Sequence, residues 1–208
     1  MKKPRLYLHE KVPYKTDKDM KYGHGEGLYR LKLIAKYSHG KVLDVGFAGH
    51  PNPYLKNVIG LDMVKADKPQ NYIEVHKGDA MNMPFKDKTF DSIVAGDVIE
   101  HLENPSKFLR ECKRVLKNDG TLVISTPNAA FLPLQPLEIL FIKKFYFNDT
   151  HINLFQPRIM YKLLRYAGFN LIKRVGAGMY IPFTRFTLPL PTAFSQHIIY
   201  ISKKWKLD

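Results

Sequence analysis

The sequence has 208 residues, of which 45% are hydrophobic and 25% are charged. This composition excludes a disordered chain and an integral membrane protein, and the length predicts one domain with its own hydrophobic core. Thirty-three Lys and Arg residues against nineteen Asp and Glu residues give a formal net charge of +14. That excess favours anionic surroundings such as RNA, phospholipid headgroups or acidic substrates, although a generally lysine-rich proteome would produce it too.

Two features bear on where the chain works. Cys112 is its single cysteine, so it cannot form an internal disulfide, and no basic and apolar leader opens the sequence. The longest apolar stretch, 129–147, is interrupted by prolines and charged residues and does not have the character of a membrane-spanning helix. We therefore expect a cytoplasmic protein.

The first segments are an arm and a helix. Residues 1–24 are rich in Lys and Tyr without a sustained period, which is typical of a basic N-terminal arm or lid. From Gly25 to Tyr37 the apolar residues follow helical spacing, and His39-Gly40 ends that pattern. We expect the main domain to cover 25–208, with an insertion at about 129–155.

Five short apolar runs follow and predict buried strands, because each is too short for a typical helix. These runs are 41–45, 57–61, 72–75, 92–95 and 121–125. Between the last two, Asn104 and Pro105 predict the start of a helix, as N-cap and first helical residue, and Asp119-Gly120 predicts the turn into the next strand.

The last third of the chain predicts one more helix at 156–167, with an apolar face that includes Ile159 and Met160, and two more strands at 170–175 and 197–202. Strands that alternate with helices indicate an α/β fold. We expect a seven-stranded, mostly parallel sheet with an antiparallel edge strand and helices on both faces.

Small and acidic residues follow the first three strands, where an open α/β sheet binds its ligands. Gly46 and Gly49 allow a tight turn and a close approach of the backbone to a ligand. Asp62 ends the second strand, where a carboxylate can bind both ribose hydroxyls, and Asp79 follows the third. Each residue taken alone could equally be a turn former, but the three in register favour a nucleoside-containing cofactor. The G-x-G-x-x-G fingerprint of a nicotinamide-binding fold is absent from 46–51.

Longer motifs carry a family resemblance. The segments 90–102, 115–122, 125–128 and 167–169 resemble, in order and spacing, those of the class I S-adenosylmethionine-dependent methyltransferases, over roughly residues 25–204. The subgroup is the type 11 kind, which includes the ubiquinone-pathway O-methyltransferases. The resemblance implies a Rossmann-like fold and S-adenosylmethionine as the cofactor.

The resemblance also implies a set of cofactor contacts. Asp62 would bind ribose, Asp79 the adenine amino group and Ala80 the adenine ring, while Gly46 would border the methionine moiety and Met63 the adenine face. The full expected set is Asp44, Gly46, Ala48, Asp62, Met63, Asp79, Ala80 and Asp97. The glycine motif departs from the family, because Ala48 and His50 stand where its second and third glycines are usual.

Methyl transfer often needs a base that removes the acceptor's proton. Glu100 and His101 follow the fourth strand, and His151 lies in the later insertion, so these three are the candidate catalytic residues. Together with Asp97 they could also supply oxygen and nitrogen ligands to a divalent metal, the lesser alternative. The set resembles the Glu-x-x-Glu-His element of ubiquinone-pathway O-methyltransferases and small-RNA 2′-O-methyltransferases, with Asp97 in place of the first Glu. A loop capped by polar side chains would account for the same residues.

The acceptor is expected to lie against the insertion and against 180–183, because loops over a rigid scaffold commonly select substrates. Their aromatic and apolar content indicates an apolar or amphipathic molecule. The function we expect is O-methylation of a small metabolite, glycan or lipid-linked acceptor. An RNA methyltransferase and a noncatalytic protein that binds cofactor or partner remain alternatives, and basic residues nearby would allow contact with an anionic membrane surface.

Overall fold

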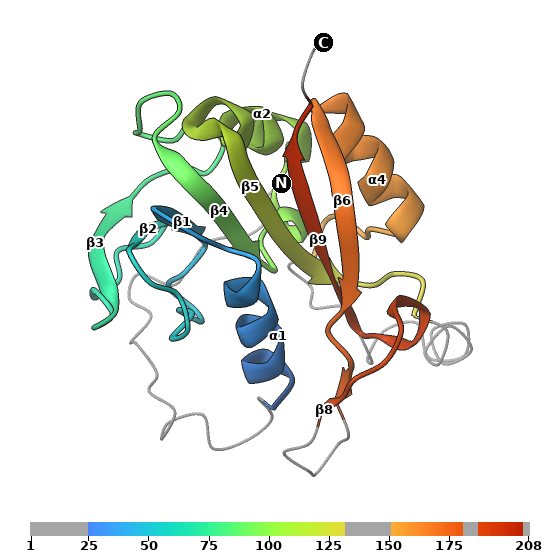
Figure 1. The fold of residues 1–208 in the computed structure, drawn as a ribbon. Coiled ribbons are helices and arrows are strands. Elements are labelled where there is room, and N and C mark those ends of the chain that lie inside the picture. The colour runs from blue at the N-terminus through green and yellow to red at the C-terminus, as the bar shows by residue number, and fades with distance from the viewer. Residues whose placement is uncertain (1–24, 132–150, 181–186, 206–208) are drawn as a thin grey trace, which may run out of the picture.

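The computed structural model describes residues 25–131, 151–180 and 187–205. The expected arm, most of the insertion and residues 181–183 of the expected acceptor border lie outside the described residues. Helices α1 (Gly25–Lys36), α2 (Pro105–Val115) and α4 (Pro157–Tyr166) accompany a large sheet (Figure 1). Its strands are β1 (Val42–Val45), β2 (Val58–Asp62), β3 (Tyr72–Lys77), β4 (Phe90–Gly96), β5 (Leu116–Pro127), β6 (Phe169–Gly176) and β9 (His197–Lys204).

The sheet has seven strands in the order β3-β2-β1-β4-β5-β9-β6, and the predicted fold class is confirmed. The strands β3, β2, β1, β4 and β5 pair in parallel, whereas β9 pairs antiparallel with both β5 and β6. The antiparallel strand therefore lies one position inside the edge, and β6 forms the edge itself. The parallel strands run toward the lower side of Figure 1, so their carboxyl ends meet there.

Helices cover both faces of the sheet (Figure 1). On one face α1 packs through Ile34 against side chains of β1, β4, β5 and β9. On the other face α2 and α4 enclose a larger core, to which α4 contributes Met160 and Leu164. Ile159, predicted for the apolar face of α4, is 48% exposed, because the core side of the helix is centred on the Met160 and Leu164 pair four residues apart.

The helix start at Asn104 is confirmed, since its side chain accepts a hydrogen bond from the Lys107 backbone N–H and Pro105 begins α2. The predicted turn at Asp119-Gly120 is wrong as a boundary. The backbone is already extended at Leu116, where β5 begins directly after α2. Pairing with β4 shifts between Phe90 and Ser92, so 117–120 form an irregularity within β5 instead of a separate turn.

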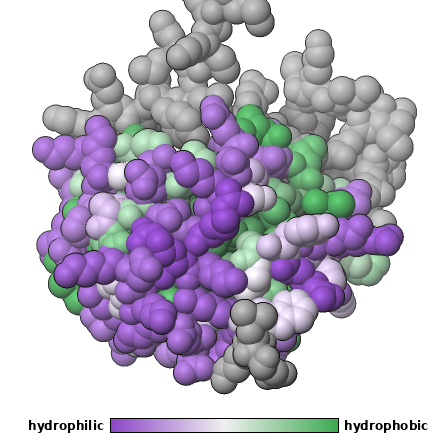
Figure 2. All heavy atoms as spheres, turned by 90° about the horizontal axis from the view of Figure 1, so that it is seen from above, coloured by the Kyte–Doolittle hydropathy of each residue, from purple (hydrophilic) through white to green (hydrophobic). Residues whose placement is uncertain are grey.

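Short elements connect these layers near the carboxyl ends of the strands. They are the 3-10 helices η1 (Ile99–His101) and η2 (Thr192–Phe194) and the two-stranded ribbon of β7 (Met179–Tyr180) and β8 (Thr187–Leu188). Figure 2 views the opposite end of the sheet, where hydrophilic residues cover most of the surface. No helix in the described part of the chain has the length and apolar character needed to cross a membrane.

Candidate active site

The loop after β1 depends on Gly46. Its φ of +77° lies in the left-handed region, which residues other than glycine rarely adopt. A Cβ at this position would overlap the Cγ2 atom of Val98, which follows β4, so the loops after β1 and β4 meet here. Gly49 has open space around it and no positive φ. Gly46 is therefore required by the local geometry, whereas Gly49 is not.

Asp62 ties the second strand to this loop. Its Oδ2 accepts a hydrogen bond of 2.9 Å from the Ala48 N–H, and its Oδ1 accepts one of 3.0 Å from the Val64 N–H. Each carboxylate oxygen can accept a further bond, and Asp62 remains half-buried. The adjacent Met63 side chain is 41% exposed. The Ala48 side chain is buried and His50 is exposed, so neither replacement for a glycine forces the loop apart.

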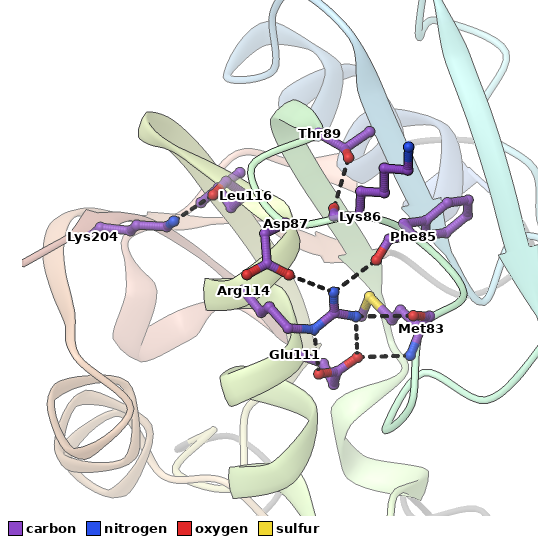
Figure 3. Close-up of polar contacts among 9 residues, drawn as sticks. All are labelled: Met83, Phe85, Lys86, Asp87, Thr89, Glu111, Arg114, Leu116 and Lys204. Carbon is purple, nitrogen blue, oxygen red and sulfur yellow. Dashed lines mark hydrogen bonds and ion pairs between the residues drawn. The ribbon is translucent and has the colours of Figure 1, made fainter.

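Asp79 begins a turn after β3, where its Oδ1 accepts a hydrogen bond of 2.7 Å from the Met81 N–H. Arg114 of α2 fixes the continuation of this turn (Figure 3). Its guanidinium donates to carboxylates of Glu111 and Asp87 and to backbone carbonyls of Met83 and Phe85. This cation holds 83–87 against α2, and β3 precedes the turn. The Asp79 turn is therefore anchored both before and after it.

Asp44 lies deeper than the other candidates. Its side chain accepts a short hydrogen bond from the Tyr72 hydroxyl, which in turn accepts one of 3.0 Å from the Asn52 N–H. Burial raises the pKa of Asp44 to about 7, although the bonds from Tyr72 and Asn52 oppose that rise. Only 5% of Asp44 is exposed. Its role is therefore structural, because it binds the Tyr72 hydroxyl and the backbone of Asn52.

Three side chains from three elements meet at Asp97, which directly follows β4. Its Oδ2 lies 3.0 Å from Nη1 of Arg30 and 3.3 Å from Nε2 of His197, and its Oδ1 accepts a 2.9 Å bond from the Ser125 hydroxyl. Burial alone would raise the pKa of Asp97, but Arg30, His197 and Ser125 together hold it below its usual value. Asp97 has a φ of +56°, so this strained turn is held by its charge partners.

Glu100 is the buried member of η1. Its side chain is 1% exposed, and Oε2 accepts a 3.1 Å bond from the Thr126 hydroxyl. Its Oε1 is buried without a hydrogen-bond partner among the described residues. Burial, and next the negative charge of Asp97, raise the pKa of Glu100. A buried carboxyl group with an unfilled oxygen is costly unless something binds it, which marks Glu100 as a functional candidate.

Glu100, His101 and His151 come together as the sequence predicts. One ligand atom from each lies within 4.8 Å of the other two, and the two imidazole rings stack edge to face with centroids 4.7 Å apart. The backbone N–H groups of Ile152 and Asn153 donate to the Glu100 carbonyl, which fixes His151 beside η1. Burial, and next the proximity of His101, lower the pKa of His151, so its imidazole is neutral at neutral pH.

Comparison with known proteins decides the family. The family described as "Methyltransferase domain" matches residues 43–124. An uncharacterized protein of Methanocaldococcus jannaschii is 30% identical over 172 residues, 77% of this chain and 80% of that protein. A probable S-adenosylmethionine-dependent methyltransferase of Mycolicibacterium smegmatis is 30% identical over 129 residues, 58% of this chain and 46% of that protein. The chain belongs to the class I S-adenosylmethionine-dependent methyltransferases.

A solved structure agrees with the fold of this methyltransferase. The S-adenosylmethionine-dependent methyltransferase of Thermotoga maritima, described as a possible histamine N-methyltransferase, superposes with a TM-score of 0.65 at 20% identity. The match covers 85% of this chain and 91% of that one. The methyltransferase spans less than half the length of the Mycolicibacterium relative, however.

The residues present fit the family's cofactor, S-adenosylmethionine. The loop that follows β1, called the Gly46 cradle below, has no room for a Cβ at Gly46, and Asp62 is bonded to it through the Ala48 N–H. Met63 after β2 and Asp79 after β3 lie at the same edge of the sheet, each with part of its surface exposed. A nucleoside needs such a combination of close backbone, a carboxylate for its hydroxyls and an apolar face for its base.

Sequence reasoning missed several residues of the methyltransferase site: Arg30, Ser125, Thr126 and His197. Arg30 carried a signal, since it lies four residues before Ile34 on the buried side of α1, where a charged residue needs a partner. The other three offered none, because Ser and Thr are common at strand ends and a lone His is a weak signal.

Proposed function

We propose that the chain transfers the methyl group of S-adenosylmethionine to a hydroxyl oxygen of a small acceptor: a metabolite, glycan or lipid-linked molecule. The convergence of Glu100, His101 and His151 beyond the end of β4 carries this proposal. Val98, which contacts the loop at Gly46, immediately precedes the 3-10 helix that contains Glu100 and His101, and this closeness supports the proposal.

Two side chains of this cluster, His151 and Glu100, have distinct parts in the proposal. The acceptor oxygen attacks the methyl carbon as the carbon–sulfur bond breaks, and the hydroxyl proton passes to an imidazole. His151 suits that task because its lowered pKa keeps the ring neutral and able to accept a proton. Glu100, whose raised pKa favours the protonated form, can donate a hydrogen bond within the cluster.

As an alternative to this acid–base arrangement, we propose that the same three residues bind a divalent metal ion. Two imidazoles and one carboxylate form a ligand set used by catalytic zinc and non-haem iron sites. The bound ion would lower the pKa of the acceptor hydroxyl. Asp97, a fourth candidate in the sequence, is instead paired with Arg30 and His197.

Isotope-labelled S-adenosylmethionine with a metabolite extract tests methyl transfer directly. The expected result is a labelled small product, which His151→Ala should form about a hundredfold more slowly with the affinity for S-adenosylmethionine unchanged. His76→Ala, a histidine on β3, is the matched control and should keep the wild-type rate. Cofactor binding without any labelled product from the extract would favour the noncatalytic alternative.

Metal binding needs its own measurement. After treatment with a chelator, titration with Zn²⁺ or Mn²⁺ should show about one ion per chain in calorimetry, a stoichiometry set by a single three-ligand site. Glu100→Gln and His101→Ala should remove that binding, whereas Asp97→Asn should retain it. Absence of binding in the wild-type protein would reject the ligand set.

A further inference from the structure

The positive charge of this protein is unevenly distributed. Residues 150–207 contain no Asp or Glu, although the rest of the chain is rich in both. The Lys and Arg residues of this stretch are Arg158, Lys162, Arg165, Lys173, Arg174, Arg185, Lys203, Lys204 and Lys206. In the described part of the chain, these residues belong to α4, β6 and β9, so this flank of the sheet carries cations without carboxylates of its own.

A cleft of about 560 Å³ opens on this flank, between α4 and the edge strand β6. From α4 it is lined by Arg158 and Tyr161, and from β6 by Leu171 and Arg174. Both arginines are exposed, and none of the described residues that line the cleft is a carboxylate. Its wall thus combines two guanidinium groups with an aromatic ring and an aliphatic side chain.

The two arginines differ from those that stabilise the fold. Arg30 and Arg114 each form ion pairs with carboxylates, whereas Arg158 and Arg174 form no ion pair with any described residue. The adjacent start of α4 adds positive potential, since the Gln156 side chain does not cap the helix and its first turn has no acid. The cleft therefore has an unbalanced positive charge on two sides.

A short segment of the chain joins the cleft to the cluster of Glu100, His101 and His151. Ala130 and Gln156 form the near wall of the cleft, and the Ala129 N–H donates to the carbonyl of Phe155. Four residues before Phe155 lies His151, whose segment is bonded to the Glu100 carbonyl. Five residues along the chain separate His151 from Gln156, so their Cα atoms lie at most about 18 Å apart, a span that one extended acceptor can bridge.

We propose that this cleft binds a phosphate group of the methyl acceptor, with an apolar part of the same molecule against Tyr161 and Leu171. The proposal rests on the proposed function, which it extends by naming a phosphate-bearing acceptor. Guanidinium groups from two separate elements suit phosphate, which presents oxygens on several sides, better than a single planar carboxylate.

Titration with inorganic phosphate and pyrophosphate, followed by backbone amide NMR, tests the cleft without methyl transfer. Saturable shifts are expected at 156–161 and 171–174. Arg158→Gln and Arg174→Gln should each weaken pyrophosphate binding about tenfold, the value of one hydrogen bond to a charged group. Arg110→Gln, an exposed arginine of α2 outside the cleft, should stay within twofold of wild type.

Two further binding experiments, with lipid vesicles and with RNA, show which kind of phosphate-bearing molecule the cleft binds. Vesicles with and without phosphatidylglycerol report whether a lipid headgroup supplies it, in which case vesicle binding should also require Arg158 and Arg174. Shifts that do not saturate, or that Arg110→Gln reduces as much as the cleft variants do, would overturn the proposal. Equal loss of binding to a single-stranded RNA in all three variants would point to general polyanion attraction and overturn it as well.

Calorimetry with S-adenosylmethionine keeps this test distinct from that of the proposed function. The cleft variants should bind the cofactor with wild-type affinity, because neither arginine lies near the Gly46 cradle. If wild-type protein binds pyrophosphate in the cleft but transfers no methyl group, the proposed function fails and the anion site stands. If methyl transfer occurs without saturable binding in the cleft, the cleft proposal fails alone.

Discussion

The Nη1 atom of Arg30 lies 3.0 Å from the Oδ2 atom of Asp97 and 2.7 Å from the Ser125 hydroxyl oxygen. Through these contacts α1 is joined to the carboxyl ends of β4 and β5, where the candidate site begins. The Asp97 side chain is 23% exposed and that of Arg30 10% exposed, so water screens this pair only in part.

Arg30→Met should destabilise the fold by about 1–3 kcal/mol, less than the roughly 3–5 kcal/mol for a fully buried pair, because Asp97 keeps some solvent. Asp97→Asn should suit the left-handed backbone at this position, which asparagine tolerates well. In urea unfolding, the double variant should be more stable than the sum of the two single effects predicts. Strictly additive effects would mean that the two side chains are not coupled.

Gly46→Ala should lower stability by about 1–3 kcal/mol, because a side chain there is strained by the positive φ and overlaps Val98. Gly49→Ala is the matched control, because Gly49 lies in the same loop with open space around it. It should change stability by less than about 0.5 kcal/mol. Adding Val98→Ala to Gly46→Ala should recover part of the loss. Thermal unfolding measures all three, and equal effects of the two glycine substitutions would contradict the assigned geometry.

Asp44 should make stability depend on pH. Its pKa is about 7 in the folded chain against an ordinary 3.8, so the folded state holds a proton that the unfolded state releases. The contribution of Asp44 to stability therefore falls as the pH rises from about 4 to about 7, and is constant above. Asp44→Asn stays neutral and still accepts from Tyr72, so its stability relative to wild type should rise across that window. Urea unfolding at a series of pH values checks this, and a constant difference would reject it.

Asp62→Asn should weaken binding of S-adenosylmethionine at least tenfold. The two carboxylate oxygens accept the backbone bonds of the loop and are proposed to accept those of the ribose hydroxyls, whereas an amide has only one acceptor oxygen. Asp67→Asn removes an exposed carboxylate five residues along and should leave the affinity within twofold. Calorimetry gives both values. A similar loss in the two variants would mean that net charge, and not the ribose contact, sets the affinity.

The sequence predicted the elements and their order because these follow from local patterns. Apolar runs and the Asn104-Pro105 start of α2 depend on neighbouring residues, and Asp62 and Asp79 could be placed because they follow recognisable strands. The Arg30, Ser125 and His197 contacts with Asp97 join residues far apart in the chain, so only the folded sheet brings them together. The turn at Asp119-Gly120 failed as a boundary because β5 already begins at Leu116, which pairs with Phe90, and 117–120 are extra residues within the strand before pairing resumes at Thr121.

The position of β9 has a consequence for how the chain folds. This strand is the last element of the sheet along the sequence, yet it separates β5 from β6 and pairs with both. During synthesis β6 is made before β9, so it has no partner in the sheet until 197–204 have been synthesised. A chain cut before His197 would leave the edge of β5 open to strands of other molecules, so truncation there should produce aggregation and not merely a smaller domain.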